Sequence, residues 1–281
     1  MTDIFSKDPN LASPDEVFEM GEAYRLGEIV ERDLTKAVEL WRIAGKRDHP
    51  QAQLRLGKAY LEGEGVKANL MVGLKWLRKA AQAGLDEALL LYGKTVLDAQ
   101  RDGTYAVKEF KYFLHRANRG NPKYQYFAGH AYYTGLGVEK DLALAAKYWK
   151  LAADQGHGES QYNLGQLYHS GDGVKMNPIK AAKYWKLAAD QGHPQAQFNI
   201  GLAYYIGDGV ENDYGQSINY LRLAEPEGAP NTLFILGLAY LDGNGVEKDQ
   251  IKAIKYFQRS ARQGFESAKD KLREIGAPTI G

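Results

Sequence analysis

A glycine recurs every 36 residues along most of this chain. Its seven copies are Gly21, Gly57, Gly93, Gly129, Gly165, Gly201 and Gly237. A fixed period of this length is typical of solenoid proteins, in which each repeat packs only on its neighbours and no central core is needed. The period therefore predicts a stack of repeats, and residues that recur with it are expected to serve the repeat itself.

The fifth copy shows how one repeat is built. A first helix is predicted from Glu159 to about Ser170, because its apolar residues recur at helical spacing. Residues 171–174 (Gly-Asp-Gly-Val) end that helix, since glycine adopts the left-handed conformation without a Cβ penalty. Asn177 as N-cap and Pro178 in the first turn then start a second helix. Each repeat is thus predicted to be a helical hairpin.

The repeated glycine lies inside the first helix, where glycine is less favourable than alanine by about 0.8–1 kcal/mol. We expect close contact between the two helices to offset this cost. In the fifth repeat, Gly165 is predicted to let the alanine-rich face of the second helix approach.

The ends of the array are predicted from local signals. Ser13 and Glu16 form a capping box around Pro14, which starts the first helix. An amphipathic pattern after Phe265 predicts one more helix, with the polar outer face that a terminal repeat needs. The predicted organisation is an extension at 1–13, a seven-repeat array at 14–264, a capping helix at 265–276 and a flexible tail at 277–281.

Three motifs resemble the Sel-one-like repeat (SLR) family, a relative of the tetratricopeptide repeats. They are Ala-Gln-Phe-Asn-Ile-Gly at 196–201, Tyr-x-x-Gly-x-Gly-Val at 168–174, and the Ala-Ala-Lys-Tyr-Trp-Lys-Leu-Ala-Ala-Asp-Gln-Gly run at 181–192. The resemblance extends from about Pro14 to Lys271. It implies an all-α, right-handed α-solenoid from a bacterium, with the first helices lining a concave face.

The third repeat, residues 93–122, departs from the pattern. Ala99-Gln-Arg-Asp102 replaces the expected glycine loop, and Tyr105 stands where the other repeats have Asp or Asn. Val96 replaces the tyrosine that recurs at this position in the other six repeats. We interpret this stretch as a drifted repeat with a reshaped loop, since loops tolerate change. The alternative is an altered edge that contacts a partner.

Composition excludes several classes of function. The 36 basic and 35 acidic residues give no general attraction to nucleic acid or acidic membranes. Without cysteine the chain has no disulfide or thiol chemistry. The first residues lack the apolar stretch of a signal peptide, and no apolar run is long enough to span a membrane. We therefore expect a cytoplasmic protein that neither binds nucleic acid nor inserts into a membrane.

The variable positions of the first helices are the candidates for binding. By analogy with tetratricopeptide repeats, positions −3, +1 and +4 from the repeated glycine are expected to face the groove, with −2 at its edge. In repeats four to six these positions hold mainly aromatic, amide and imidazole side chains, which suit peptide capture. The candidates are Tyr126, His130, Tyr133, Tyr162, Asn163, Gln166, His169, Phe198, Asn199 and Tyr205. At −3 the favoured interpretation is instead that the ring packs between adjacent repeats.

Other groups that suggest chemistry are explained by the repeat. His49, His157 and His193 share one turn position, and His130 with His169 lacks a third ligand, so no metal site is predicted. The glycine loops lack the remaining features of a phosphate-binding motif. No catalytic residue and no cofactor site is predicted.

The favoured function is a non-enzymatic scaffold or adaptor that binds a partner protein or peptide segment in the concave groove, as the resemblance implies. One alternative is a cytoplasmic immunity or inhibitor protein that neutralises a toxin or effector. A third is a peptidoglycan-related or hydrolytic enzyme. The resemblance gives this role little support, because the secreted relatives linked to it carry paired cysteines and an export signal, and neither feature is found in this sequence.

Overall fold

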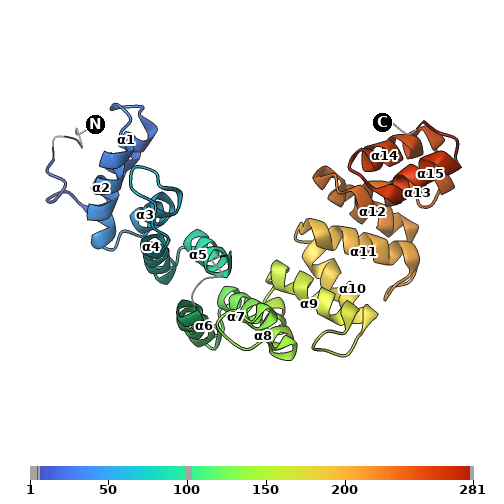
Figure 1. Cartoon of the computed structure of the whole chain (residues 1–281), viewed down its shortest axis with the longest axis horizontal. Helices are drawn as coiled ribbons and strands as arrows, with labels where there is room; N and C mark the ends of the chain where they lie inside the picture. The colour runs from blue at the N-terminus through green and yellow to red at the C-terminus, as the bar shows by residue number, and fades with distance from the viewer. Residues whose placement is uncertain (1–4, 6, 99–102, 279–281) are drawn as a thin grey trace. The chain divides into compact units, whose positions relative to one another are not determined.

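Figure 1 shows the computed structural model of the chain, which describes residues 5, 7–98 and 103–278, with the backbone alone for 103–105. Within these residues every regular element is a helix, as the sequence predicts. The chain divides into two compact units, residues 1–109 and 110–281, and the division falls inside helix α6 (Gly103–Ala117).

The described part of the first unit contains five α-helices and the start of α6. Their bounds are α1 Pro14–Leu26, α2 Leu34–Lys46, α3 Pro50–Glu62, α4 Leu70–Gln82 and α5 Asp86–Asp98. Helices α1 with α2, and α3 with α4, form antiparallel hairpins, and α2 and α4 also pack on the helix that follows. Each second helix therefore joins its own hairpin to the next one.

The second unit repeats this arrangement. Its helices are α7 Pro122–Thr134, α8 Leu142–Ala153, α9 Gly158–Ser170, α10 Pro178–Ala189, α11 Pro194–Ile206, α12 Tyr214–Ala224, α13 Pro230–Asp242, α14 Gln250–Arg262 and α15 Glu266–Glu274. A short 3-10 helix, η2 (Glu225–Glu227), follows α12. The hairpins α7–α8, α9–α10, α11–α12 and α13–α14 stack in chain order, and α15 packs on α14.

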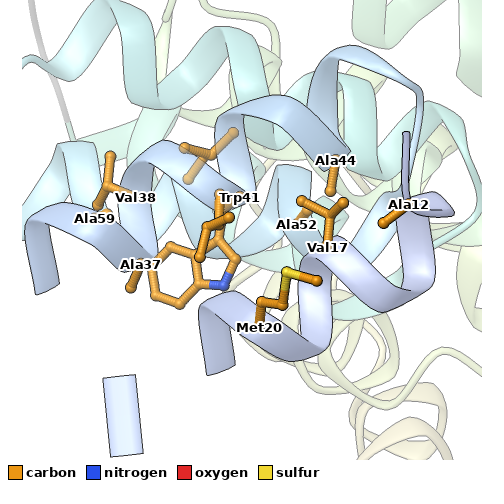
Figure 2. Close-up of a cluster of buried hydrophobic side chains, with 11 residues drawn as sticks. Ala12, Val17, Met20, Ala37, Val38, Trp41, Ala44, Ala52 and Ala59 are labelled. Carbon is orange, nitrogen blue, oxygen red and sulfur yellow. The ribbon is translucent and has the colours of Figure 1, made fainter. Parts of the chain in front are cut away.

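The buried apolar side chains run from hairpin to hairpin. Figure 2 shows this in the first unit, where Met20 of α1, Trp41 of α2 and Ala59 of α3 belong to one cluster. In the second unit a similar cluster joins Trp185 of α10 to Ile200 of α11. Neither unit needs a central core, as expected for a solenoid.

The repeated glycine makes room for a large side chain of the second helix. A Cβ built on Gly165 would lie 2.5 Å from Cδ1 of Trp185, and one on Gly129 would lie 2.5 Å from Cδ1 of Trp149. The prediction of close contact is confirmed. The side chain that meets the glycine is Trp185 of the alanine-rich face, whose indole ring is long enough to reach across the hairpin.

The second glycine of the loop joins neighbouring hairpins. Gly173 has φ +69°, and a Cβ there would overlap the backbone carbonyl of Leu142 in the preceding hairpin. Gly209 stands in the same relation to Pro178. The hairpin of α1 and α2 has Ile29 at this position, and among the described residues no hairpin packs against it from the N-terminal side.

Buried glutamines provide a second link between hairpins. Gln161 donates from Nε2 to the carbonyl of Ala153 at 3.2 Å, and Gln125 donates to Ala117 at 3.3 Å. These carbonyls lie at the end of the preceding helix, and each also accepts from the backbone N–H of a turn glycine, Gly156 or Gly120. The glutamine of the Ala-Gln motif therefore adds a second hydrogen bond to the end of the neighbouring helix.

Local hydrogen bonds are found at both described ends of the chain. The capping box predicted at Ser13 and Glu16 is present. Near the other end, the backbone N–H of Ala277 donates to the carbonyl of Leu272, and the side-chain amide of Gln258 donates to the carbonyl of Pro278. Residues 279–281 lie outside the described residues.

The third repeat is described only in part. Ala99–Asp102, where the sequence predicts a reshaped loop, lie outside the described residues. Helix α6 starts at Gly103, so Tyr105 is the third residue of a helix and not its N-cap. Among the described helices, none is both long and apolar enough to cross a membrane.

We expect Gly165→Ala to destabilise the protein by up to about 2 kcal/mol. Alanine gains up to about 1 kcal/mol in helix propensity, but its Cβ would clash with the Trp185 ring, and overpacking costs about 1–3 kcal/mol. The control is Gly158→Ala in the same helix, where the nearest atom would be 3.5 Å away. Urea unfolding of both variants is the measurement, and equal stability of the two would contradict the packing account.

We expect Gly173→Ala to lose about 1–3 kcal/mol more than Gly156→Ala. Both glycines have positive φ, +69° and +87°, so both substitutions carry the left-handed strain of about 1–2 kcal/mol. Only Gly173 faces a neighbouring backbone, whereas a Cβ on Gly156 would have open space. Thermal unfolding of the pair isolates the contact between hairpins, and equal losses would show that strain alone matters.

Candidate functional site

A hollow of about 440 Å³ opens between α7 and α9 of the second unit. Seven of the ten residues predicted from the variable positions line it. They are Tyr126, His130, Tyr133, Tyr162, Asn163, Gln166 and His169. The structure thus brings the candidates of repeats four and five together on one surface.

The aromatic rings at −3 form the floor of the hollow. The Tyr162 ring stacks on His193 with centroids 4.3 Å apart, and the Tyr126 ring lies 5.0 Å from that of His157. Each of these histidines belongs to the next hairpin, so the rings pack between repeats as favoured from the sequence. Burial, with a smaller effect of the Glu159 charge, raises the pKa of Tyr126 to about 12. The phenol therefore stays neutral.

The three turn histidines are N-caps. The backbone N–H of Ser160 donates to Nδ1 of His157 at 3.2 Å, and His49 and His193 cap α3 and α11 in the same way. Accepting this hydrogen bond requires a neutral imidazole with its proton on Nε2. Burial lowers the pKa of His157, which favours that form. Their shared turn position therefore reflects helix capping.

The rim of the hollow carries exposed side chains supported by tryptophan. The Tyr133 ring lies 5.3 Å from Trp149, and the His169 ring lies 5.1 Å from Trp185. His169 also faces Asp208, with 3.5 Å between Nδ1 and the carboxylate. The tryptophans that fill the space above the repeated glycines therefore also position the +4 residues.

The three candidates of repeat six do not line the hollow. Asn199 donates to Oε1 of Gln166 at 2.8 Å and so borders it. Phe198 packs in the cluster around Ile218. Tyr205 contacts the ring of Tyr214 at 5.3 Å, and its hydroxyl accepts a hydrogen bond from Asn244. These side chains have structural partners, which their positions relative to the repeated glycine could not show.

Sequence reasoning missed three notable residues of the hollow, Trp149, Glu159 and Asp172. Trp149 comes from α8, and its indole N–H donates to the carbonyl of Tyr126 at 3.2 Å. The two carboxylates lie near opposite ends of α9, outside the positions at −3, +1 and +4. The sequence does contain a signal for an acidic surface here, because no Lys or Arg occurs between Glu159 and Asp172. In the described residues no group of three or more His, Asp or Glu is placed to hold a metal.

We expect the stability of the protein to fall as the pH drops below about 6.5, partly through His157. Its pKa in the folded state lies below the ordinary value of 6.5, so below that pH the unfolded chain binds more protons. The contribution is fully present above pH 6.5 and is lost as the pH falls. The comparison variant is His157→Asn. Asparagine can cap α9 as Asn121 caps α7, and it has no titrating group.

The measurement is the urea midpoint between pH 5 and 8 for the wild type and His157→Asn. The slope with pH decreases in the variant if His157 contributes as described. An unchanged slope would assign the acid sensitivity to other groups. Absolute stability is not the readout, because asparagine also loses the ring contact with Tyr126.

A family model of the Sel1 repeat matches six stretches of the chain. They are residues 17–49, 50–85, 122–157, 158–193, 194–225 and 230–265. The unmatched interval between residues 85 and 122 contains most of the irregular third repeat. No match was found among curated protein sequences.

Two solved structures share the fold over most of the chain. One is a protective antigen present in uropathogenic Escherichia coli strains, which displays an SLR fold, with 28% identity and a TM-score of 0.78 over 95% of this chain. This chain spans only 59% of that protein. The other is a Sel1 repeat protein from Oxalobacter formigenes, with 29% identity and a TM-score of 0.76, covering 93% of this chain and 76% of its own. The chain belongs to the Sel1 repeat family, and its fold is that of an SLR solenoid.

Proposed function

We propose that this protein is a non-enzymatic interaction scaffold that holds a segment of a partner protein in the hollow between α7 and α9. The observation that carries the proposal is the convergence of seven candidate side chains on one hollow of about 440 Å³. The five at −2, +1 and +4 vary between repeats, so the repeat itself does not require their side chains.

The composition of the hollow supports protein binding. Tyrosine rings offer rigid apolar area, and the amides of Asn163 and Gln166 can exchange hydrogen bonds with a peptide backbone. The rings of Tyr126 and Tyr162 are already fixed by His157 and His193. Little side-chain freedom is therefore lost on binding, which favours affinity.

The size of the hollow favours a segment over a whole folded partner. A stable interface between folded proteins buries about 800 Å² on each side, and an inhibitor of a toxin would need a contact of that order. The hollow would form only a part of such a surface. A stretch of a few residues would instead be largely enclosed by it.

We expect the triple variant Tyr133→Ala, Gln166→Ala and His169→Ala to lose at least about tenfold in partner affinity. All three side chains are exposed, so helicity should be retained. The matched control is Leu151→Ala, Leu187→Ala and Leu223→Ala, which truncates exposed side chains on the second helices. The measurement is affinity capture from the source cell, followed by calorimetry with the partner identified.

The triple variant at Tyr133, Gln166 and His169 is called the rim variant, and the control at the three leucines is called the leucine variant. Retention of the partner by the rim variant, with loss by the leucine variant, would contradict the proposal. It would place the binding surface on the second helices. Circular dichroism of both variants checks that the fold is preserved.

A further inference from the structure

We infer that the hollow between α7 and α9 takes an extended segment with a basic side chain at each end and apolar residues between them. The inference rests on the proposed function and specifies the chemistry of the partner. The same hollow supplies the three observations that carry it, which are its charge, its rings and its length.

The charged residues that line the hollow are two carboxylates, Glu159 and Asp172, and no Lys or Arg lines it. Two other hollows of comparable size in the described residues differ. One of about 500 Å³ in the last hairpins is lined by Arg222, Lys248 and Lys252 beside Glu247 and Asp249. One of about 420 Å³ in the first unit is lined by Lys75, Arg78 and Lys108 beside Glu109. The purely acidic charged lining distinguishes the hollow between α7 and α9 from these two and complements a basic partner.

Both carboxylates are accessible to a partner. The Glu159 side chain is 58% exposed although it lies 3.6 Å from Nε2 of His193. This histidine caps α11 through its other ring nitrogen. Asp172 is exposed in the loop after α9. A basic side chain of a partner can therefore reach both carboxylates.

The rings between the carboxylates suit both parts of such a segment. Tyr133 is 42% exposed, and the ammonium group of Lys140 already lies 5.7 Å from its ring centroid. The ring therefore interacts with a cation within the protein itself, as electron-rich ring faces do. The Tyr126 and Tyr162 rings of the floor provide apolar area for the residues in between.

The length of the hollow sets the spacing of the two basic residues. Helix α9 has 13 residues and is therefore about 20 Å long. Glu159 lies in its first turn and Asp172 just beyond its end. An extended chain covers the same distance in about six residues. The expected segment thus has two basic residues separated by about four others.

The test uses three labelled hexapeptides with Arg, Gln or Glu at both ends and the same Leu-Ser-Tyr-Leu centre. Fluorescence anisotropy measures their binding to the full chain. We expect the arginine peptide to bind at least about tenfold more tightly than the glutamine peptide, and the glutamate peptide to bind most weakly. Raising the salt from about 50 to 500 mM should reduce the preference.

The double variant Glu159→Gln and Asp172→Asn should abolish the preference for arginine. The control is Glu266→Gln with Asp270→Asn on α15, which makes the same change in net charge on an exposed surface elsewhere and should retain it. No preference among the peptides, no binding of any of them, or an unchanged preference in the double variant would overturn the inference.

Failure of this inference is distinguishable from failure of the proposed function. In one outcome, the double variant at Glu159 and Asp172 still binds the native partner, while the triple variant at Tyr133, Gln166 and His169 does not. The hollow is then the site, but its carboxylates do not select the segment. If neither variant affects the native partner, the proposed function itself is wrong.

Discussion

Six of the hairpins in the described residues depend on one contact, in which a large side chain of the second helix fills the space above the glycine of the first. In the fifth repeat the pair is Gly165 and Trp185. An aromatic side chain buries about 150–250 Å², which corresponds to at most about 4–6 kcal/mol of transfer free energy. The glycine costs about 1 kcal/mol in the helix. The contact is therefore favourable by a wide margin, and the glycine is its necessary partner.

The same contact connects the fold to the candidate site. Trp149 supports the Tyr133 ring and donates a hydrogen bond to the carbonyl of Tyr126, so one core residue positions two groups of the hollow. The histidine cap has a similar double role, because His157 starts α9 and packs on the Tyr126 ring. The variable residues of the hollow are thus held by residues that recur with the repeat. This lets the exposed positions vary without loss of the scaffold.

The sequence predicts the fold well because periodicity reports which face of a helix is buried. The first helix of the fifth repeat is predicted from Glu159 and observed from Gly158. Periodicity predicted the face of the second helix that approaches Gly165, but it does not tell which side chain of that face reaches across the hairpin. It also contains no information on backbone donors, and the capping role of His157 therefore became visible only in the structure. Positions −3, −2, +1 and +4 from the repeated glycine predicted most of the residues that line the hollow. Glu159 and Asp172 lie outside these positions, because the positions cover the middle of each first helix and leave out its ends.

The irregular third repeat differs in its packing as well as in its loop. Glu109 lies 16 positions after the repeated glycine, where the other repeats have alanine, glycine or serine, and it is only 2% exposed. Burial raises the pKa of this carboxyl. The hydroxyl of Tyr92 donates to it, and Arg78 lies 3.4 Å away. A carboxyl could not be buried there without such partners. Tyr92 also stands where the other repeats have aliphatic residues or methionine, so the changes at 92 and 109 depend on each other. A repeat that had merely drifted in its loop would have no need of such a matched pair in its core.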